Sequence, residues 1–364
     1  AHMTKGLEIT TNGTNGTHAI NSDDETFGVL GYFDVEDPVT QPRNPDPIQK
    51  GLDFMGTCVR GSTSWDWSGA QQYITTFGAS GVASSAMEPV DAPCWRVNTT
   101  EKIWSFYPVT AEGRKPTASS TGAYSDFADV IDGTSPSSFE FNYSVPADFA
   151  AQKDLLFAYN VESKVGNTYW EKGNPYDTEE YTWVEGANDK FDVNFYHALA
   201  AVRLELADNG IADDVYIKQV SISGVYGDGD CTVSGNVGSP VTFVWDCDGY
   251  TKRTFTQTYN NDKIDPAAVL TESSKSFRAK YSSVGGAGEM FMIPQTLSGV
   301  KMTIKFSKKG IVVTKEVVLD DVAWEAGKYY TYKVQATIHV PGEYLVSNIG
   351  FSIGNFKNPR TAYL

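Results

Sequence analysis

Few side chains in this sequence are spaced for catalysis. Outside the first three residues, histidine occurs only as His18, His197 and His339. The chain lacks the H-E-x-x-H pattern of zinc hydrolases, the G-x-S-x-G turn of serine hydrolases and the G-x-x-x-x-G-K-[ST] phosphate loop. Because His197 stands among apolar residues, we expect a hydrogen-bonded core histidine there rather than a general base. The sequence therefore predicts no catalytic residue and no enzymatic activity.

Acidic side chains outnumber basic ones. The sequence has 45 Asp and Glu against 29 Lys and Arg, which gives a formal net charge of −16. Such a chain has no basic face to neutralise phosphates, so we predict no nucleic-acid partner. The same imbalance disfavours adsorption to anionic lipid. Carboxylate pairs suited to glycoside hydrolysis stay open as an alternative, because sequence spacing does not reveal their separation.

Two acidic turns could bind calcium. Asp228 and Asp230 flank one glycine, and Asp246 and Asp248 precede Gly249. Neither turn continues as the twelve-residue loop that ends in a glutamate. Aspartate in a glycine-rich turn more often serves the turn itself. We therefore predict no metal site and no cofactor, with calcium as the open alternative.

The four cysteines show no metal-binding spacing. Cys58, Cys94, Cys231 and Cys247 form no C-x-x-C pair, and no histidine lies at the spacing of a zinc ligand. Cys231 and Cys247 could face each other across a hairpin and form a disulfide. The interpretation that we favour is that all four are thiols that behave as small hydrophobic side chains.

Several tryptophans lie in loop-like sequence. Trp65, Trp67, Trp170 and Trp183 are possible ligand contacts, because an exposed indole can stack on a sugar ring or anchor a protein partner. They can equally cover the edge of a hydrophobic core in a protein with 13% aromatic residues. We favour the covering role and keep the binding role as an alternative.

The elements that position these side chains are predicted to be strands. Apolar and polar residues alternate at residues 26–35, 139–145 and 155–161, and the turn 308–310 joins two such runs as a hairpin. Residues 192–206 are helix-forming in composition but alternate in polarity, and we predict a strand from the alternation. Only residues 68–77 suggest a short helix or turn, and residues 78–93 suggest a loop. These short aromatic and β-branched runs predict an all-β protein built from sandwiches.

The length suits two domains. At 364 residues we expect one domain at 1–165 and a second at 187–364, separated by a polar stretch without clear periodicity. No run of eighteen apolar residues predicts a membrane helix. The start, Ala1-His2-Met3, is typical of a cloning remnant. We expect the native gene to encode a signal peptide before it.

The last residues, 340–364, form a tail that follows an apparently complete domain. Within it Tyr344, Val346, Ile349, Phe351 and Ile353 are the apolar positions of a strand-like run. Such a strand must bury one face, either on its own domain as an ordinary extra strand or in a groove on another molecule. A shorter alternation, with Leu7 and Ile9 as its apolar positions, stands at the N-terminus.

Several segments together resemble the fimbrillin family, specifically the Mfa-like fimbrial subunits (type V pilins) of Bacteroidales. The resemblance runs from residue 27 to residue 338 and rests on the order of its motifs rather than on any single one. These motifs are FGVLGY at 27–32, CW at 94–95, IWSFYP at 103–108, FEFNYSVP at 139–146, QKDLL at 152–156, VNFYHAL at 193–199, FMIPQTL at 291–297 and WEAGKYYTY at 324–332.

The resemblance implies two tandem transthyretin-like β-sandwich domains and a C-terminal tail resembling a donor strand. It further implies an exported lipoprotein, anchored in the outer membrane only through its lipid, that assembles with other fimbrial subunits and supports adhesion and biofilm formation. In this family an N-terminal plug strand, here carrying Leu7 and Ile9, leaves a groove that a neighbour's C-terminal strand fills. The donor residues would be Tyr344, Val346, Ile349, Phe351 and Ile353. The tail favours a stalk or anchor subunit; the alternative is a tip adhesin that binds host glycans or proteins.

One departure concerns the trigger that releases the plug. The family commonly has an arginine after the first strand, where this chain has Thr17, His18 and Ala19. The first arginine is Arg43, a possible protease site between two prolines whose use would also remove the strand at 26–35. Three alternatives follow: another protease acts, the plug leaves uncut, or the subunit accepts no donor.

Overall fold

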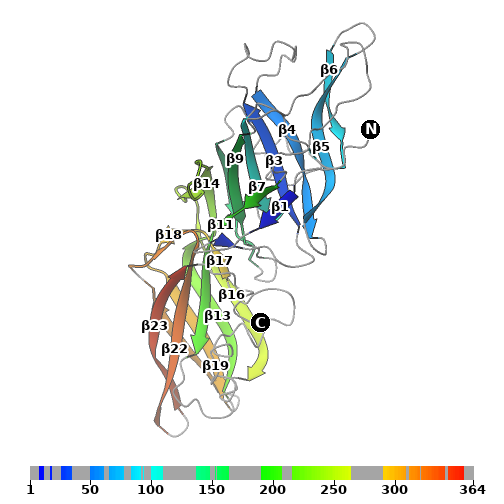
Figure 1. Ribbon diagram of the computed structural model, residues 1–364. Coiled ribbons are helices and arrows are strands. Elements are labelled where there is room, and N and C mark those ends of the chain that lie inside the picture. Colours follow the sequence, from blue (N-terminus) through cyan, green and yellow to red (C-terminus); the bar gives the residue numbers. More distant parts are fainter. Residues whose placement is uncertain are drawn as a thin grey trace.

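The computed structural model describes several separate parts of the chain. The residues described are 8–11, 17–18, 26–34, 50–60, 65–77, 83–91, 93, 100–109, 137–147, 152, 154–163, 190–206, 215–263, 290–308, 311–319, 321–340 and 343–355. All regular secondary structure among these residues is β-strand (Figure 1), so the predicted all-β class is confirmed. In this part of the chain no helix could serve as a membrane-crossing segment.

An eight-stranded antiparallel sheet dominates the N-terminal half. Its strands, in order across the sheet, are β2 (Thr17–His18), β11 (Phe195–His197), β9 (Leu156–Ser163), β7 (Thr100–Tyr107), β3 (Thr26–Asp34), β4 (Lys50–Arg60), β5 (Trp65–Phe77) and β6 (Ala83–Pro89). Both faces are covered at its centre, because Ile103, Trp104, Ser105 and Phe106 follow one another in β7 and are all buried. Consecutive buried residues of this kind are expected where a strand has a core on each face.

Two expectations for this sheet were wrong. Residues 68–77 form neither helix nor turn but belong to β5, and the expected loop at 78–93 contains the strand β6. β5 pairs with β4 on one side and β6 on the other. Trp65 is buried, Asp66 is exposed and Trp67 is half-buried, which is the alternation of a strand. Pairing on both sides therefore outweighed the weak local preference of a segment rich in small and polar residues.

Two four-stranded sheets build the C-terminal half. One contains β17 (Met290–Met292), β12 (Ala200–Leu206), β22 (Lys328–Val340) and β23 (Glu343–Asn355), and the other contains β16 (Lys252–Lys263), β13 (Val215–Tyr226), β19 (Lys301–Lys308) and β20 (Ile311–Val318). Buried residues of both sheets, such as Tyr330 and Met302, belong to one hydrophobic cluster, as in a β-sandwich. The predicted hairpin is confirmed, since Lys308 of β19 pairs with Ile311 of β20.

Three smaller sheets complete the topology. They are β15 (Thr242–Asp246), β14 (Asp228–Ser234) and β8 (Ser138–Ser144); the parallel pair β1 (Glu8–Thr11) and β10 (Lys190–Val193); and β18 (Gln295–Thr296) with β21 (Ala323–Trp324). The predicted alternation of β8 is confirmed, because Phe139, Phe141 and Tyr143 are buried while Ser138 and Glu140 are exposed. The expectation of one strand at 192–206 was wrong, because this segment contains the end of β10 and all of β11 and β12, which belong to three different sheets.

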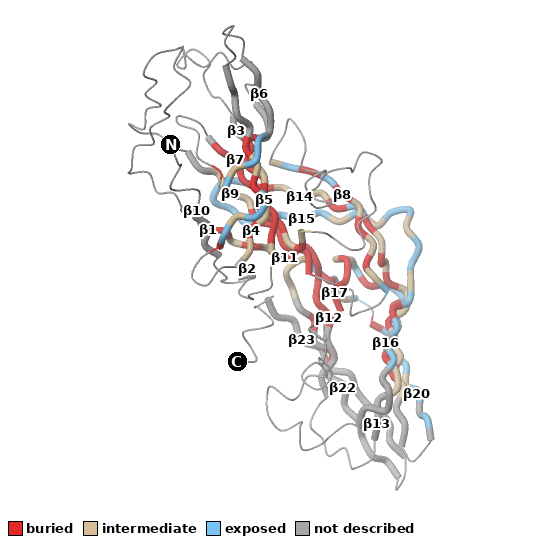
Figure 2. The backbone as a smooth tube through the Cα atoms, turned by 90° about the vertical axis from the view of Figure 1, so that its right-hand side faces the viewer, coloured by how far each residue is buried: buried red, intermediate tan, exposed pale blue. Residues whose placement is uncertain are grey.

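One hydrophobic core runs through both halves. Phe157 of β9 packs against Phe139 of β8 and Phe243 of β15, and the same cluster continues to Val202 in β12. Figure 2 shows the buried backbone continuing from β3 and β7 through β11 to β12 and β17. β10 and β11 lie beyond residue 187, yet they pair with β1, β2 and β9. Strands from beyond residue 187 thus pair with strands of the first half. The division into domains 1–165 and 187–364 stays a prediction.

Candidate functional site

The predicted donor strand is the terminal element of the C-terminal sandwich. β23 is the edge strand of its sheet and pairs antiparallel with β22 alone among the described strands (Figure 1). In register, Ile349, Phe351 and Ile353 stand opposite Val334, Tyr332 and Tyr330, and Tyr344 and Val346 stand opposite Ile338 and Ala336. In the free chain the tail thus folds back on its own domain. Its use as a donor stays a prediction.

Over residues 329–334, β22 is held by a second strand as well as by β23. It pairs parallel with β12 on its other side. The side chains of Tyr330 and Tyr332 are buried; the Tyr330 hydroxyl donates to the Ala323 carbonyl at 2.7 Å, and the Trp324 indole N–H donates to the Tyr332 hydroxyl at 3.2 Å. Burial of Tyr332 raises the pKa of its phenol to about 12. These hydrogen bonds anchor β22 to the β21 segment and fix the surface against which β23 lies.

The predicted plug strand makes a short parallel pairing. In β1, Ile9 is the register partner of Phe191 in β10 and Thr11 is that of Val193. Further along, His18 of β2 pairs with Phe195 of β11. Leu7 and the possible protease site Arg43 lie outside the described residues. The roles of β1 as a plug and of Arg43 as a cleavage site therefore stay predictions.

The tryptophans proposed as ligand contacts differ in exposure. Trp65 is only 4% exposed and packs edge-on against Phe27, with 4.8 Å between ring centroids, so its ring lies in the core. Trp67 is half-buried and packs edge-on against Phe54 at 6.1 Å. Trp170 and Trp183 lie outside the described residues. In β5 these rings cover the core edge, and a binding role stays a prediction for the part of Trp67 that faces solvent.

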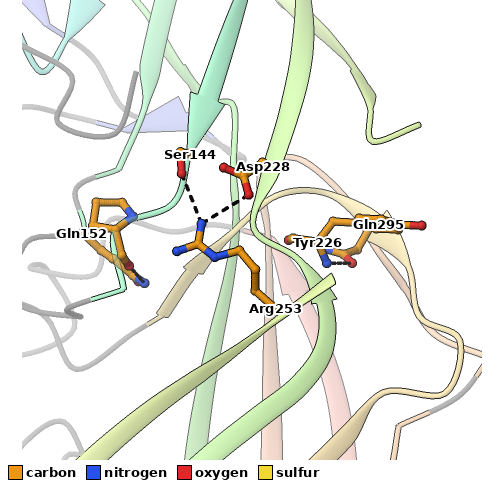
Figure 3. Close-up of polar contacts among 7 residues, drawn as sticks. Ser144, Gln152, Tyr226, Asp228, Arg253 and Gln295 are labelled. Carbon is orange, nitrogen blue, oxygen red and sulfur yellow. Dashed lines mark hydrogen bonds and ion pairs between the residues drawn. The ribbon is translucent and has the colours of Figure 1, made fainter. Parts of the chain in front are cut away.

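Backbone pairing and side-chain hydrogen bonds tie the two halves together. β8, from the first half, pairs with β14 along seven register positions, from Asp228 opposite Ser144 to Ser234 opposite Ser138. Arg253 of β16 donates through Nη1 to the Ser144 hydroxyl at 3.1 Å and to the Asp228 carboxylate at 3.4 Å (Figure 3). The same guanidinium lies over the Phe255 ring, 5.1 Å from its centroid. Arg253 thus fastens the end of β8 to the sandwich.

Two glutamine side chains form hydrogen bonds with backbone groups of other segments. The Gln152 carboxamide donates to the Pro146 carbonyl and accepts the backbone N–H of Phe291, both at 2.9 Å. The Gln295 carboxamide accepts the N–H of Tyr226 at 2.8 Å and donates to the Tyr226 carbonyl at 2.9 Å (Figure 3). Gln152 therefore joins the segment after β8 to β17, across the sequence boundary between the halves.

The buried histidine also lies at this junction. His197 Nδ1 and Asp154 Oδ2 are 2.5 Å apart, and both side chains are almost fully buried. The expectation of a hydrogen-bonded core histidine is confirmed. Next to it the Trp245 indole N–H donates to the Ala198 carbonyl at 2.9 Å, and the N–H of Gly327 donates to the Leu199 carbonyl at 3.1 Å. Strands from three sheets thus converge on residues 197–199.

Loss of the Gln152 carboxamide should loosen this junction. In the variant Gln152→Ala, the N–H of Phe291 loses this buried acceptor, and we expect the free energy of unfolding to fall by about 1–3 kcal/mol. Urea denaturation followed by tryptophan fluorescence measures the change. The control is Asn236→Ala in an exposed turn, for which we expect a change within about 0.5 kcal/mol. Equal effects of the two substitutions would contradict a role for Gln152 in joining the halves.

The hairpin β14–β15 brings the two acidic turns together. Asp230 is the register partner of Asp246, and its carboxylate accepts the Asn142 amide at 2.9 Å and the Tyr250 hydroxyl at 2.8 Å. The hydrogen bond to Asp230 is the main cause that raises the pKa of Tyr250 to about 12. Within the described ranges no three His, Cys, Asp or Glu side chains are grouped as ligands of a metal ion. The carboxylates of Asp228, Asp230 and Asp246 accept hydrogen bonds from protein donors, some within the hairpin and some on neighbouring strands.

The cysteines of this hairpin are not bonded to each other. Cys231 stands opposite Trp245 rather than Cys247, and the thiols of Cys58, Cys231 and Cys247 are free. Burial raises the pKa of the Cys58 and Cys231 thiols, and partial burial together with the nearby aspartates raises that of Cys247 to about 11. Cys94 lies outside the described residues.

Comparisons with known proteins point to one family. A family model described as fimbrillin-like matches residues 71–348, well over half of the chain. A search of curated proteins found no match. Among solved structures, a proposed cell adhesion protein from Bacteroides ovatus has 11% identity and a TM-score of 0.46, with 97% of this chain and 98% of that chain covered. A fimbrial assembly protein from Parabacteroides distasonis has 7% identity and a TM-score of 0.39, with 96% and 95% covered. We rest the assignment of the family on the family model alone.

Proposed function

This chain belongs to the fimbrillin-like family, and from this premise we propose that it is a structural subunit of a cell-surface fimbria. The observation that carries the proposal is the match of the family model over residues 71–348. A structural role also agrees with the chemistry of the described residues, whose buried polar side chains tie strands together. The partners that we propose are other fimbrial subunits, either copies of this chain or related chains.

We propose that assembly proceeds by strand exchange. The tail strand β23 leaves β22 and enters a groove on a neighbouring subunit, where backbone hydrogen bonds supply affinity and the positions of Ile349, Phe351 and Ile353 supply specificity. The position of β23 supports this proposal. As a terminal edge strand paired on one side only, it can leave without breaking any other described pairing.

The proposed receiving groove lies where the N-terminal strand β1 now pairs. β1 contributes four register pairs to β10, and these are parallel, which is slightly less stable per residue than antiparallel pairing. A short parallel strand at the chain terminus is a suitable temporary occupant. Its departure would leave the edge of β10, residues Lys190–Val193, open to the tail of a neighbour.

Removal of the N-terminal segment should accelerate assembly. A chain that lacks residues 1–19 has lost β1 and β2, so the edge of β10 is open from the start. We expect it to form ladders on gels run without boiling, and fibres in electron micrographs, faster than the intact chain does. The matched control lacks only residues 1–6, keeps β1 and should assemble at the rate of the intact chain. Equal rates for the two shortened chains would refute β1 as the plug.

We propose the cell surface as the place of action. Export, a lipid anchor in the outer membrane, and adhesion or biofilm formation by the assembled fimbria belong to the same proposal. Host glycans or proteins are proposed partners of the fimbria if the subunit stands at its tip.

A further inference from the structure

The strand β23 occupies one edge of the C-terminal sandwich. β23 pairs with β22 over nearly the whole length of both strands, from Lys328 opposite Asn355 to Val340 opposite Glu343, with two register shifts. It also lies close to β20, the edge strand of the facing sheet. β23 thus closes one side of the sandwich. When it leaves, the edge of β22 and the side of the sandwich next to β20 are uncovered together.

We propose that the edge of β22 is an alternative acceptor to β10, and that its occupant is β23 of another copy of this chain. The inference rests on the proposed function, because it requires the tail to leave its own domain. The acceptor is different from that of the proposed function. Here it is the edge of β22, which each copy's own tail occupies before assembly. This acceptor opens as soon as the tail departs and requires no cut in the chain.

Over residues 329–334, β22 has contacts that do not depend on β23. Its other edge is paired with β12, and its Tyr330 and Tyr332 hydroxyls are hydrogen-bonded to Ala323 and Trp324. An edge strand held in this way presents a row of backbone donors and acceptors, which is a template for another strand. A tail of identical sequence fits the same register, so the backbone hydrogen bonds that break within one chain form again between two chains.

The connection between the two strands favours the exchange. Only residues 341 and 342 separate Val340 of β22 from Glu343 of β23, and they are Pro341 and Gly342. Two-residue hairpins favour type I′ and II′ turns, which need a positive φ at their first central residue. The proline ring fixes φ near about −65°. Proline followed by glycine suits a type II turn instead, which splays the flanking strands, whereas an exchanged strand, whose chain runs straight on, needs no turn.

Exchange at this site is open-ended. A copy that gives its tail to the next copy empties its own β22 edge, which then receives the tail of the preceding copy. The donor and acceptor surfaces differ, so the interface is heterologous, and such interfaces extend as filaments unless the rotation closes a ring. The same edge thus serves each subunit first as the resting place of its tail and then as its binding site.

Paired cysteines test this register directly. Thr331 and Ser352 are register partners, and residues directly opposite in antiparallel strands have Cα atoms about 4.5–5.5 Å apart, within disulfide range. A chain with Thr331→Cys is mixed with a chain with Ser352→Cys under assembly conditions, oxidised and analysed by non-reducing gel and peptide mass spectrometry. We expect a disulfide between positions 331 and 352 of different copies. A mixture of Thr331→Cys with Ser347→Cys, which is not a register partner, should give none, and neither should the wild type with its four native thiols.

Two further variants make each outcome informative. With both substitutions in one chain, an internal disulfide should lock the tail and abolish exchange at β22 until it is reduced. Pro341→Asn creates an Asn-Gly turn suited to a hairpin and should reduce the link between copies. If tail-dependent polymers form without any link between positions 331 and 352 of different copies, the inference falls while the proposed function stands. If no tail-dependent polymer forms at all, both fall.

Discussion

A chain that ends at Val340 should fold and remain monomeric. It keeps β22 whole and loses residues 341–364, including β23. The pairing of β22 with β12 and the buried Tyr330 and Tyr332 remain, so we expect the shortened chain to retain its core and its cooperative unfolding. Polymerisation should be abolished, because the chain has no strand to donate. Ladders on unboiled gels and fibres in electron micrographs measure the loss.

The shortened chain should also act as a terminator. It keeps acceptor edges but cannot donate, so adding it to the intact chain should shorten the polymers in proportion to its share. A control chain that lacks only residues 356–364 keeps β23 and should polymerise normally. Polymers formed by the chain that ends at Val340 would refute the tail as donor.

Phe157→Ala should destabilise both halves of the molecule at once. Phe157 is fully buried, and its ring lies 5.6 Å from that of Phe139, 5.7 Å from that of Phe141 and 5.9 Å from that of Phe243. A buried phenylalanine replaced by alanine costs about 3–5 kcal/mol of unfolding free energy. Because its neighbours belong to β8 and β15, the loss should lower the stability of the whole cluster rather than of one sheet.

Guanidinium denaturation followed by circular dichroism and tryptophan fluorescence measures this effect. We expect a single transition at a lower midpoint, with both signals coinciding. The matched control is Val244→Ala on β15, whose side chain is 66% exposed and for which we expect a change within about 0.5 kcal/mol. Two separated transitions in the Phe157 variant would show that the halves unfold independently, contrary to a shared core.

Much of the fold could be predicted from local patterns. The alternation in β8 and the turn between β19 and β20 are short-range signals, and both predictions are confirmed. The strand β5 was missed because residues 68–72, such as Ser68 and Gln72, carry little local preference and interrupt the strand-forming residues on either side. Pairing with β4 and β6 determines its conformation, and that information lies elsewhere in the chain.

The junction could not be predicted for a similar reason. Gln152 bonds to Phe291 and Arg253 bonds to Ser144, over more than a hundred residues of sequence in each case. Arg253 stands in none of the motifs quoted for the resemblance, and Gln152 stands in QKDLL without any local sign of its distant partner. His197 was easier, because its apolar neighbours already indicated burial. Its partner Asp154 lies just before β9, and the pairing of β9 with β11 brings the two side chains together.

The position of the tail in the assembled fibre tests the central claim most directly. Cryo-electron microscopy of polymers of the intact chain would trace residues 343–355 of each subunit. We predict that this strand runs from its own subunit into a neighbour and pairs there, along either β10 or β22. A fibre in which every subunit keeps β23 on its own β22 would contradict assembly by strand exchange.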